Sequence, residues 1–270
     1  MKNRKSPILK KIVLILVALF ILVPIANLLV WVFTERWSWP DLLPQVYSLR
    51  ALQEILENKE FLIKTLLSSV LISGVVAVLS VAIAIMTARA LTLYEFKGKG
   101  LFQFLSILPF LVPATVFAMG IHVSFIRWGL SNNLLGVILS HTICSLPYAV
   151  QLLSGGIKAV GTGLEEQARV LGASAWKAFF KVTLPLLTPG ILSGMSMAFV
   201  VSLSQYFLTL LIGGGQVQTF AVVMVPYLQG GYRNISSVYS IIFLTITLVV
   251  FAVLEWVIEK INKNIKVEYY

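Results

Sequence analysis

Six long runs without an acidic or basic residue dominate the sequence, and each is 21 to 27 residues long. An α-helix needs roughly 20 apolar residues to cross about 30 Å of bilayer hydrocarbon. Backbone in hydrocarbon must satisfy its own hydrogen bonds, so the runs are predicted to be helices. Barrel strands would alternate apolar and polar residues, which these runs do not. The runs are Ile12 to Phe33, Thr65 to Ala88, Leu101 to Ile126, Leu134 to Ile157, Leu186 to Ile212, and Asn234 to Leu254.

The composition supports a polytopic membrane protein. Hydrophobic residues make up 58% of the chain, charged residues only 12%, and the mean hydropathy is +0.91. Soluble domains carry about 25% charged residues, so this chain has too few to cover a water-facing surface. A soluble enzyme, a disordered chain and a fibrous repeat protein are therefore excluded. The single cysteine, Cys144, excludes an internal disulfide and a cysteine-based metal cluster.

The basic residues predict the orientation. With the N-terminus inside, 15 of the 21 Lys and Arg residues fall in internal segments, as cytoplasmic loops require. Both termini are therefore predicted to be inside, with six spans. The same bias explains the formal net charge of +10 without a nucleic-acid partner. The first run is 22 residues long and no small-residue cleavage site follows it, so a retained helix is expected rather than a cleaved signal.

Three segments follow from this arrangement. Residues 1–60 are expected to form a transmembrane helix and an external loop, with a short amphipathic helix around Leu52 to Leu56. Residues 61–260 are expected to form a five-helix core that contains the internal loop 158–185, and residues 261–270 a cytoplasmic tail. Pro109 and Pro113 are predicted to kink the third helix, and Pro147 the fourth.

Several kinds of site are missing from the runs. No Asp or Glu lies within them, which argues against a proton-driven carrier, although a sodium-coupled carrier that uses backbone carbonyls stays open. His122 and His141 have no metal-ligand spacing and are expected to be hydrogen-bonding packing residues. The chain has no phosphate-binding loop and no catalytic triad pattern. No enzyme activity, metal or bound cofactor is predicted.

The internal loop is the most informative segment. Leu164 to Leu171 is a helix-forming stretch with two carboxylates in its first turn, where the positive helix end favours them. Gly172 can end that helix in the left-handed conformation, and Ser174 can cap a second helix. Pro185 then restricts the chain where it re-enters the membrane. The loop is predicted to form two short helices with a sharp corner, and a basic, aromatic helix lying on the membrane surface is the simpler alternative.

This segment resembles the EAA motif of permease subunits in binding-protein-dependent ABC importers. The family pattern is Glu-Ala-Ala, three residues, Gly, nine residues, Ile, one residue, Leu-Pro. Five of its seven specified positions agree, and the departures are Gln167 for Ala and Val182 for Ile. The motif also lies in the internal loop before the penultimate run, as in the family. The resemblance covers about residues 61 to 260.

The resemblance implies an all-α type I importer permease with a cytoplasmic coupling helix. That helix would dock in a groove of a separate ATPase subunit, where ATP and Mg bind, and would transmit closure of an ATPase dimer to the membrane helices. The chain itself would bind no cofactor. The residues that the resemblance assigns to ATPase coupling are Glu166, Gln167, Ala168, Gly172, Ala173, Ser174, Leu184 and Pro185.

The substrate is less well defined by the sequence. Ser202, Gln205 and Tyr206 are candidates for the translocation path, or hydrogen-bond between helices instead. The stretch around them looks most like permeases of the polyamine, ferric iron and thiamine group. Gln205 stands where polyamine permeases often carry an acidic residue, which speaks against a polyamine.

The expected partners are an ATPase dimer, an extracytoplasmic substrate-binding protein, membrane lipid and a second permease, a different one being preferred to a second copy. The expected location is the bacterial cell membrane, with no role for nucleic acid. A secondary ion-coupled carrier is the main alternative. A membrane enzyme is a further alternative, but no polar catalytic cluster near one surface supports it. A structural or insertase-like membrane protein is another, and it could use the amphipathic loop as a surface anchor.

Overall fold

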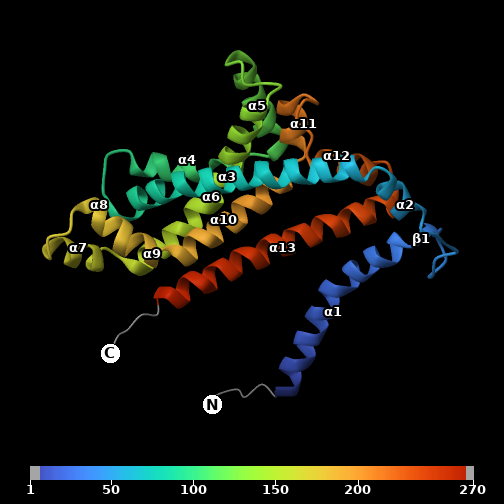
Figure 1. Cartoon of the computed structure of the whole chain (residues 1–270), viewed down its shortest axis with the longest axis horizontal. Helices are drawn as coiled ribbons and strands as arrows, with labels where there is room; N and C mark the ends of the chain where they lie inside the picture. Colours follow the sequence, from blue (N-terminus) through green and yellow to red (C-terminus); the bar gives the residue numbers. More distant parts are fainter. Residues whose placement is uncertain (1–6, 266–270) are drawn as a thin grey trace. The chain divides into compact units, whose positions relative to one another are not determined.

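The computed structural model describes residues 7–265. Most of these residues are helical, and the rest form loops and one small hairpin (Figure 1). Four helices are long and apolar enough to cross a membrane. They contain the first, second, fourth and sixth apolar runs: α1 (Pro7–Val32), α3 (Lys59–Leu93), α6 (Leu134–Val160) and α13 (Arg233–Ile265). Helix α6 continues through Pro147 without interruption.

The third run is broken rather than kinked. Helices α4 (Lys99–Leu111) and α5 (Ala114–Arg127) meet at an angle of 113°. Proline restricts the residue before it to extended backbone, and Val112 has φ −92° and ψ 132°. Pro113 also has no N–H to continue the helix. Pro109 lies within α4.

The fifth run is divided as well. Helix α10 (Thr188–Leu203) ends before residues 204–206, and α11 (Phe207–Gly213) follows. Before α10 lie α8 (Ala175–Ala178), the π-helical turn η1 (Phe179–Thr183) and α9 (Leu184–Leu186). The segment from α8 to α9 makes an angle of 69° with α10. If each bent pair counts as one span, the described chain has up to six, the number predicted.

The chain divides into two compact units. One contains α1, the loop that follows it up to Leu62, and residues Met224–Ile246, and the other contains Ile63–Val223 and the segment from Thr247. In the first unit, β1 (Thr34–Arg36) pairs antiparallel with β2 (Val46–Tyr47), a hairpin that the sequence did not predict. The predicted short helix is confirmed as α2 (Arg50–Glu57), which buries Ala51 and Ile55 on one face. Helix α12 (Phe220–Gln229) lies in the glycine-rich segment and contains Pro226.

Helices α3, α6 and α10 form the core of the second unit. Val81, Ala84 and Ala88 of α3 pack with Ala149 and Leu153 of α6 in one buried cluster. Small residues on α10 permit this close approach. A Cβ added at Gly194 would lie 3.4 Å from the Val81 side chain and 3.7 Å from the Ala149 Cα. The small-residue stripe of α10 thus packs within the chain.

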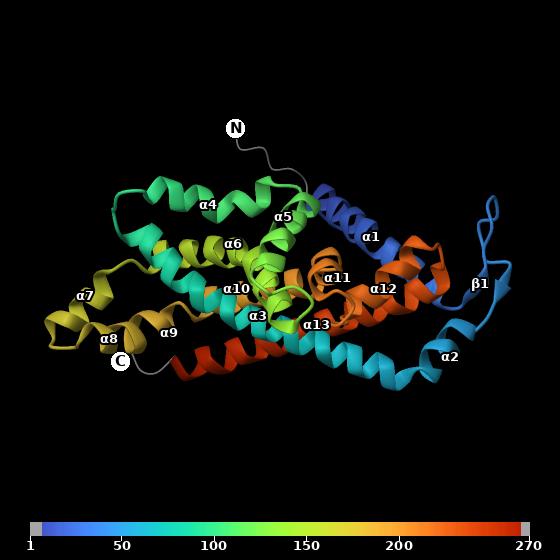
Figure 2. The ribbon, with the colours of Figure 1, turned by 90° about the horizontal axis from the view of Figure 1, so that it is seen from above.

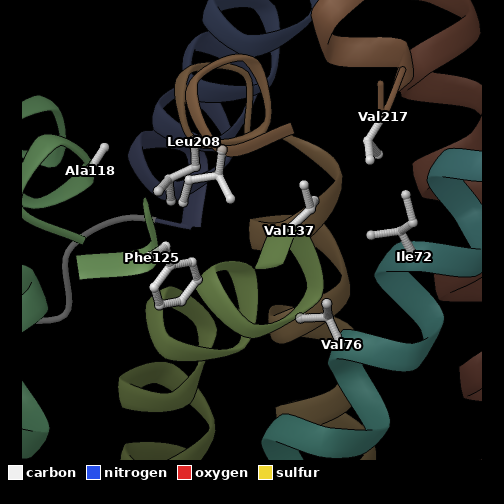
Figure 3. Packing of buried hydrophobic residues seen from close by; sticks show 8 residues of the cluster. Ile72, Val76, Ala118, Phe125, Val137, Leu208 and Val217 are labelled. Carbon is white, nitrogen blue, oxygen red and sulfur yellow. The ribbon is translucent and has the colours of Figure 1, made fainter. Parts of the chain in front are cut away.

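A second buried cluster lies farther along the same helices (Figure 3). It joins α3 and α6 to the short helices α5 and α11. The broken halves of the third and fifth runs are therefore held by side-chain packing, not by helix continuity. Its buried members are Ile72, Val76, Ala118, Phe125, Val137, Leu208, Ile212 and Val217.

Candidate functional site

The loop 158–185, which the sequence predicts to be internal, forms a corner between two short helices. Helix α7 (Gly163–Val170) has Glu165 and Glu166 in its first turn. Figures 1 and 2 show α7 and α8 at the end of the second unit that lies farthest from α11. Gly172 ends α7 with φ +93°, the left-handed conformation that glycine adopts at least cost. The helix end and the corner are at the predicted residues.

Two backbone hydrogen bonds close this corner. The Ala173 N–H donates to the Ala168 carbonyl and the Gly172 N–H to the Arg169 carbonyl, both at 3.0 Å. This pair of bonds is the Schellman motif, which satisfies carbonyls that a helix end leaves unpaired. The corner is thus held by backbone geometry and does not depend on a neighbouring chain.

The second arm of the corner begins at Ser174, as predicted. Its side-chain oxygen accepts a hydrogen bond from the Lys177 backbone N–H at 3.3 Å. After the four residues of α8 the α-helix widens into η1, which ends two residues before Pro185. The ring of Pro185 would clash with the carbonyl of residue 181 in a regular α-helix, which accounts for the wider turn.

Large apolar side chains are exposed around the corner. Val170 and Leu171 are 87% and 88% exposed, and Trp176 and Phe180 are also exposed. Trp176 and Phe180 stack with ring centroids 6.0 Å apart. An exposed apolar patch on a loop that also carries Lys177 and Lys181 fits contact with another molecule.

The predicted coupling residues lie around the corner. Their backbones form its two arms, and their exposure differs. Glu166, Gln167, Gly172 and Ser174 are exposed, whereas Ala168, Ala173, Leu184 and Pro185 are half-buried. Their assignment to ATPase coupling stays a prediction.

The structure adds an ion pair that the sequence reasoning missed. Arg89, near the end of α3, donates from Nη1 to Glu165 Oε2 at 2.7 Å and from Nη2 to Oε1 at 2.9 Å. The two side chains are 15% and 13% exposed. Thr183 of η1 donates its hydroxyl to the same carboxylate at 2.6 Å. The Arg89 guanidinium also lies over the Phe179 ring, 5.0 Å from its centroid.

The charges of this cluster reinforce one another. The hydrogen bonds from Arg89 lower the pKa of the Glu165 carboxyl below its ordinary value, the Thr183 hydroxyl acts in the same direction, and partial burial opposes both. Glu165 is therefore ionised at neutral pH. Arg89 and Glu165 are 76 residues apart, so no local pattern could have paired them.

The candidate translocation residues lie at the break after α10. Ser202 is buried, and Gln205 and Tyr206 are half-buried beside the break. Ser202 Oγ lies 2.9 Å from His141 Nδ1, and Thr209 Oγ1 lies 2.9 Å from His141 Nε2. In this structure Ser202 thus bonds between helices α6 and α10. Its part in a substrate path stays a prediction.

The hydrogen bonds assign the tautomer of His141. Thr209 donates its single hydroxyl hydrogen to the Gln205 carbonyl at 2.6 Å, so it must accept from His141 Nε2–H. In a neutral imidazole, which carries one ring N–H, His141 Nδ1 then accepts from Ser202. The fully buried His141 thus links α6, α10 and α11. Within residues 7–265 no group of three or more His, Cys, Asp or Glu is arranged to hold a metal ion.

Comparison with known proteins identifies relatives among transport proteins. The pattern of the family described as "Binding-protein-dependent transport system inner membrane component" matches residues 80–267. The molybdate/tungstate transport system permease protein WtpB of Pyrococcus furiosus is 30% identical over 80% of this chain and 86% of its own length. The molybdenum permease ModB of Escherichia coli is 28% identical over 72% and 92%. The sulfate permease CysT of Escherichia coli is 24% identical over 89% and 88%.

Solved structures share the fold. A chain of a bacterial ABC transporter that imports the acidic polysaccharide alginate matches with a TM-score of 0.68 at 17% identity, over 94% of this chain and 95% of that one. A chain of an amino acid ABC transporter matches with a TM-score of 0.57 at 17% identity, over 77% and 97%. The alginate transporter is also known in complex with a periplasmic protein bound to an alginate pentasaccharide.

Proposed function

The chain belongs to the family of binding-protein-dependent transport system inner membrane components, and from this premise we propose that it couples a substrate path to a separate ATPase through the corner after α7. It is a multi-pass membrane protein, the permease subunit of an ABC importer, with the type I importer permease fold. The resemblance drawn from residues 166–185 is thereby confirmed. The assignment as a transport subunit agrees with the relatives.

The corner itself is the observation that carries the coupling proposal. A helix that only lies on a membrane surface needs one continuous apolar face. Here two short arms meet at Gly172 instead, and the apolar side chains of Val170 and Leu171 project at their junction. A compact apolar tip on a rigid turn fits a groove in a folded partner. The partner that we propose is an ATPase subunit, which would hold ATP and Mg and hydrolyse the ATP.

We infer that the substrate is a tetrahedral oxyanion. The relatives are permease proteins of transport systems for molybdate or tungstate, molybdenum and sulfate, and one further relative is a putative 2-aminoethylphosphonate permease of Salmonella typhimurium. The polyamine, ferric iron and thiamine group expected from the sequence has no support among them. The absence of Asp and Glu from the six apolar runs fits an anion, because a carboxylate in a low-dielectric path would repel it.

The remaining partners follow from the same proposal. A permease with one coupling corner pairs with a second permease, either a relative or a second copy, to form a two-fold pathway. An extracytoplasmic binding protein would deliver the oxyanion. Closure of the ATPase pair would then draw the corners together and turn the pathway outward. The cell membrane is the expected location.

Reconstitution tests the proposal directly. The chain would be co-expressed with the ATPase subunit and the second permease that the proposal requires, and the complex would be placed in proteoliposomes with the binding protein outside. Molybdate uptake that requires internal ATP and persists with a proton or sodium ionophore supports an importer. Uptake that the ionophore abolishes and ATP does not drive would instead support a secondary carrier.

Substrate choice is tested in the same vesicles. Unlabelled tungstate and sulfate should compete with molybdate for uptake, whereas spermidine and thiamine should not. Competition by the cations alone would contradict the oxyanion assignment.

A further inference from the structure

The corner is joined to the core of the second unit by two different routes. One route is the chain itself, which runs from the corner through α8, η1 and α9 into α10. This route contains a π-helical turn and a bend of 69°. The other route is the side-chain contact from Glu165 of α7 to Arg89 of α3.

The first route, along the chain through η1, bends easily. A π-helical turn has wider and weaker hydrogen bonding than an α-helix, and such turns mark sites of bending. Displacement of the corner would be absorbed there before it reached α10. A rigid connection to the membrane helices therefore has to come from elsewhere.

The second route is stiff. Two parallel hydrogen bonds join Arg89 to Glu165 and fix the orientation of the carboxylate as well as its distance. Thr183 bonds the same carboxylate from η1, so three segments meet at one group. Low exposure strengthens the pair relative to a surface salt bridge.

A second short ion pair, between Lys99 and Glu95, differs in sequence separation and exposure. Lys99 Nζ lies 2.7 Å from Glu95 Oε1, yet the two residues are only four positions apart. The Glu95 side chain is 89% exposed. This pair joins neighbouring residues of one segment and serves as a matched control.

The cluster also lies at the end of an apolar groove of about 640 Å³. One wall of the groove belongs to α3 and ends at Ile85, one helical turn before Arg89. The other wall begins at Leu184, directly after Thr183. The lining residues lie between Val78 and Ile85 on α3 and between Leu184 and Met195 on α9 and α10. Arg89, Glu165 and Thr183 thus connect the two walls at one end.

We propose that Arg89, Glu165 and Thr183 are positioning residues that make the corner and the inner end of α3 move as one body. This inference rests on the proposed function, since it assumes that a partner moves the corner. The three side chains transmit that motion to α3 past the compliant η1 turn, and they keep the two groove walls in register. None of the three contacts the substrate in this mechanism.

Distance measurements test the mechanical part without any partner. Cysteines for spin labels replace Met86 and Leu171, which are both exposed, in a Cys144→Ser background. Arg89→Gln, Glu165→Gln and Thr183→Val should broaden the distribution of distances between the labels. Glu95→Gln should leave it unchanged. Equal distributions in all variants would overturn the proposal.

Transport measurements test the functional part. In the reconstituted importer, Arg89→Gln should reduce substrate imported per ATP hydrolysed by about tenfold, within the usual range of coupling between sites. The ratio of substrate imported to ATP hydrolysed should be intermediate for Arg89→Lys, between wild type and Arg89→Gln. Lysine keeps the positive charge but loses the bidentate contact. The exchange Arg89→Glu with Glu165→Arg should restore part of the ratio. A purely structural role would lower the amount of complex and leave this ratio unchanged.

The two inferences fail in distinguishable ways. If no ATPase subunit co-purifies with the wild-type chain and ATP drives no import, the proposed function is wrong. This conclusion does not depend on the spin-label distances. If the wild type couples normally and Arg89→Gln does too, the proposed function stands and the positioning role is wrong.

Discussion

The backbone N–H of Ala173 donates to the carbonyl oxygen of Ala168 at 3.0 Å, and this bond folds the loop 158–185 back on itself. It requires Gly172 between them to have φ +93°. The direction in which Val170 and Leu171 project is therefore set by one glycine. Changes at that glycine should alter coupling without altering insertion.

Substitution of Gly172 is the most direct test of the corner. A Cβ at this position would meet nothing within 4 Å, so the cost comes from the left-handed backbone and not from a clash within the chain. That strain is about 1–2 kcal/mol for an ordinary residue and less for Asn and Asp. Gly172→Asp should abolish uptake while the protein stays in the membrane, because it also places a charge beside the exposed apolar side chains of Val170 and Leu171. Gly172→Asn has a similar backbone cost and no charge, so it should retain more uptake.

Gly163 provides the control for this prediction. It begins α7, has no positive φ, and a Cβ there would also meet nothing. Gly163→Ala should therefore leave uptake and membrane insertion unchanged. Full uptake with Gly172→Asp would show that the corner is not needed for transport.

Substitution of the two adjacent carboxylates of α7, Glu165 and Glu166, should reduce uptake to very different extents. Glu166 is exposed, and an isolated surface charge contributes about 0–1 kcal/mol. Glu165 holds Arg89 and Thr183. Glu166→Gln should reduce uptake only slightly and Glu165→Gln strongly, at equal protein levels in the membrane. The reverse order would contradict the roles assigned to them.

The loop 158–185 should become more accessible to proteases at acidic pH, because Glu165 loses its ion pair with Arg89. Because the pKa of Glu165 is lowered in the folded protein, its ion pair stabilises the fold above the unfolded pKa and is lost as the pH falls through the folded pKa. Limited proteolysis of the loop in detergent should therefore accelerate from neutral to acidic pH in the wild type. Glu165→Gln should be cleaved quickly at neutral pH, and the difference between the two proteins should shrink in acid.

The hydrogen bonds of His141 should stabilise the packing of α6 against α10 and α11. His141→Leu leaves the Ser202 hydroxyl buried without its partner, at a cost of about 1–3 kcal/mol. Thermal unfolding in detergent should shift to lower temperature for His141→Leu and for Ser202→Ala. Ser204→Ala, which removes an exposed hydroxyl from the same segment, should leave the midpoint unchanged.

Gln205 tests the proposed path. Gln205→Glu places a negative charge beside the break between α10 and α11, and an oxyanion that passes there would be repelled. Molybdate uptake should fall severalfold, whereas Gln216→Glu at an exposed position should have little effect. Equal uptake by both variants would place the path elsewhere.

Local features of the chain were predictable because they depend on neighbours in sequence. The long helices follow from apolar runs that hydrocarbon forces into helical backbone. The corner follows from Gly172 and Ser174, since a left-handed glycine and a helix cap each act within a few residues. The motif then pointed to the family that the comparison confirmed.

Other features needed contacts between distant segments. Pro113 predicted a kink, yet the turn is 113°, because burial of Ala118 and Phe125 against α6 and α11 holds α5 in its own direction. The hairpin of β1 and β2 also escaped prediction, since strands this short carry no periodic signal. The polyamine, ferric iron and thiamine group expected from the sequence finds no support among the relatives, and neutral polar residues do not distinguish between small solutes.

The sequence by itself determined that this chain is a helical membrane protein with a motif-bearing corner, because hydropathy and capping act over short distances along the chain. Only the tertiary structure decided what the corner is attached to. Arg89 and Glu165 lie 76 residues apart, and the packing of α3 against α6 and α10 brings them into contact. A charge pair of that kind depends on where the helices pack, and no spacing in the sequence encodes it.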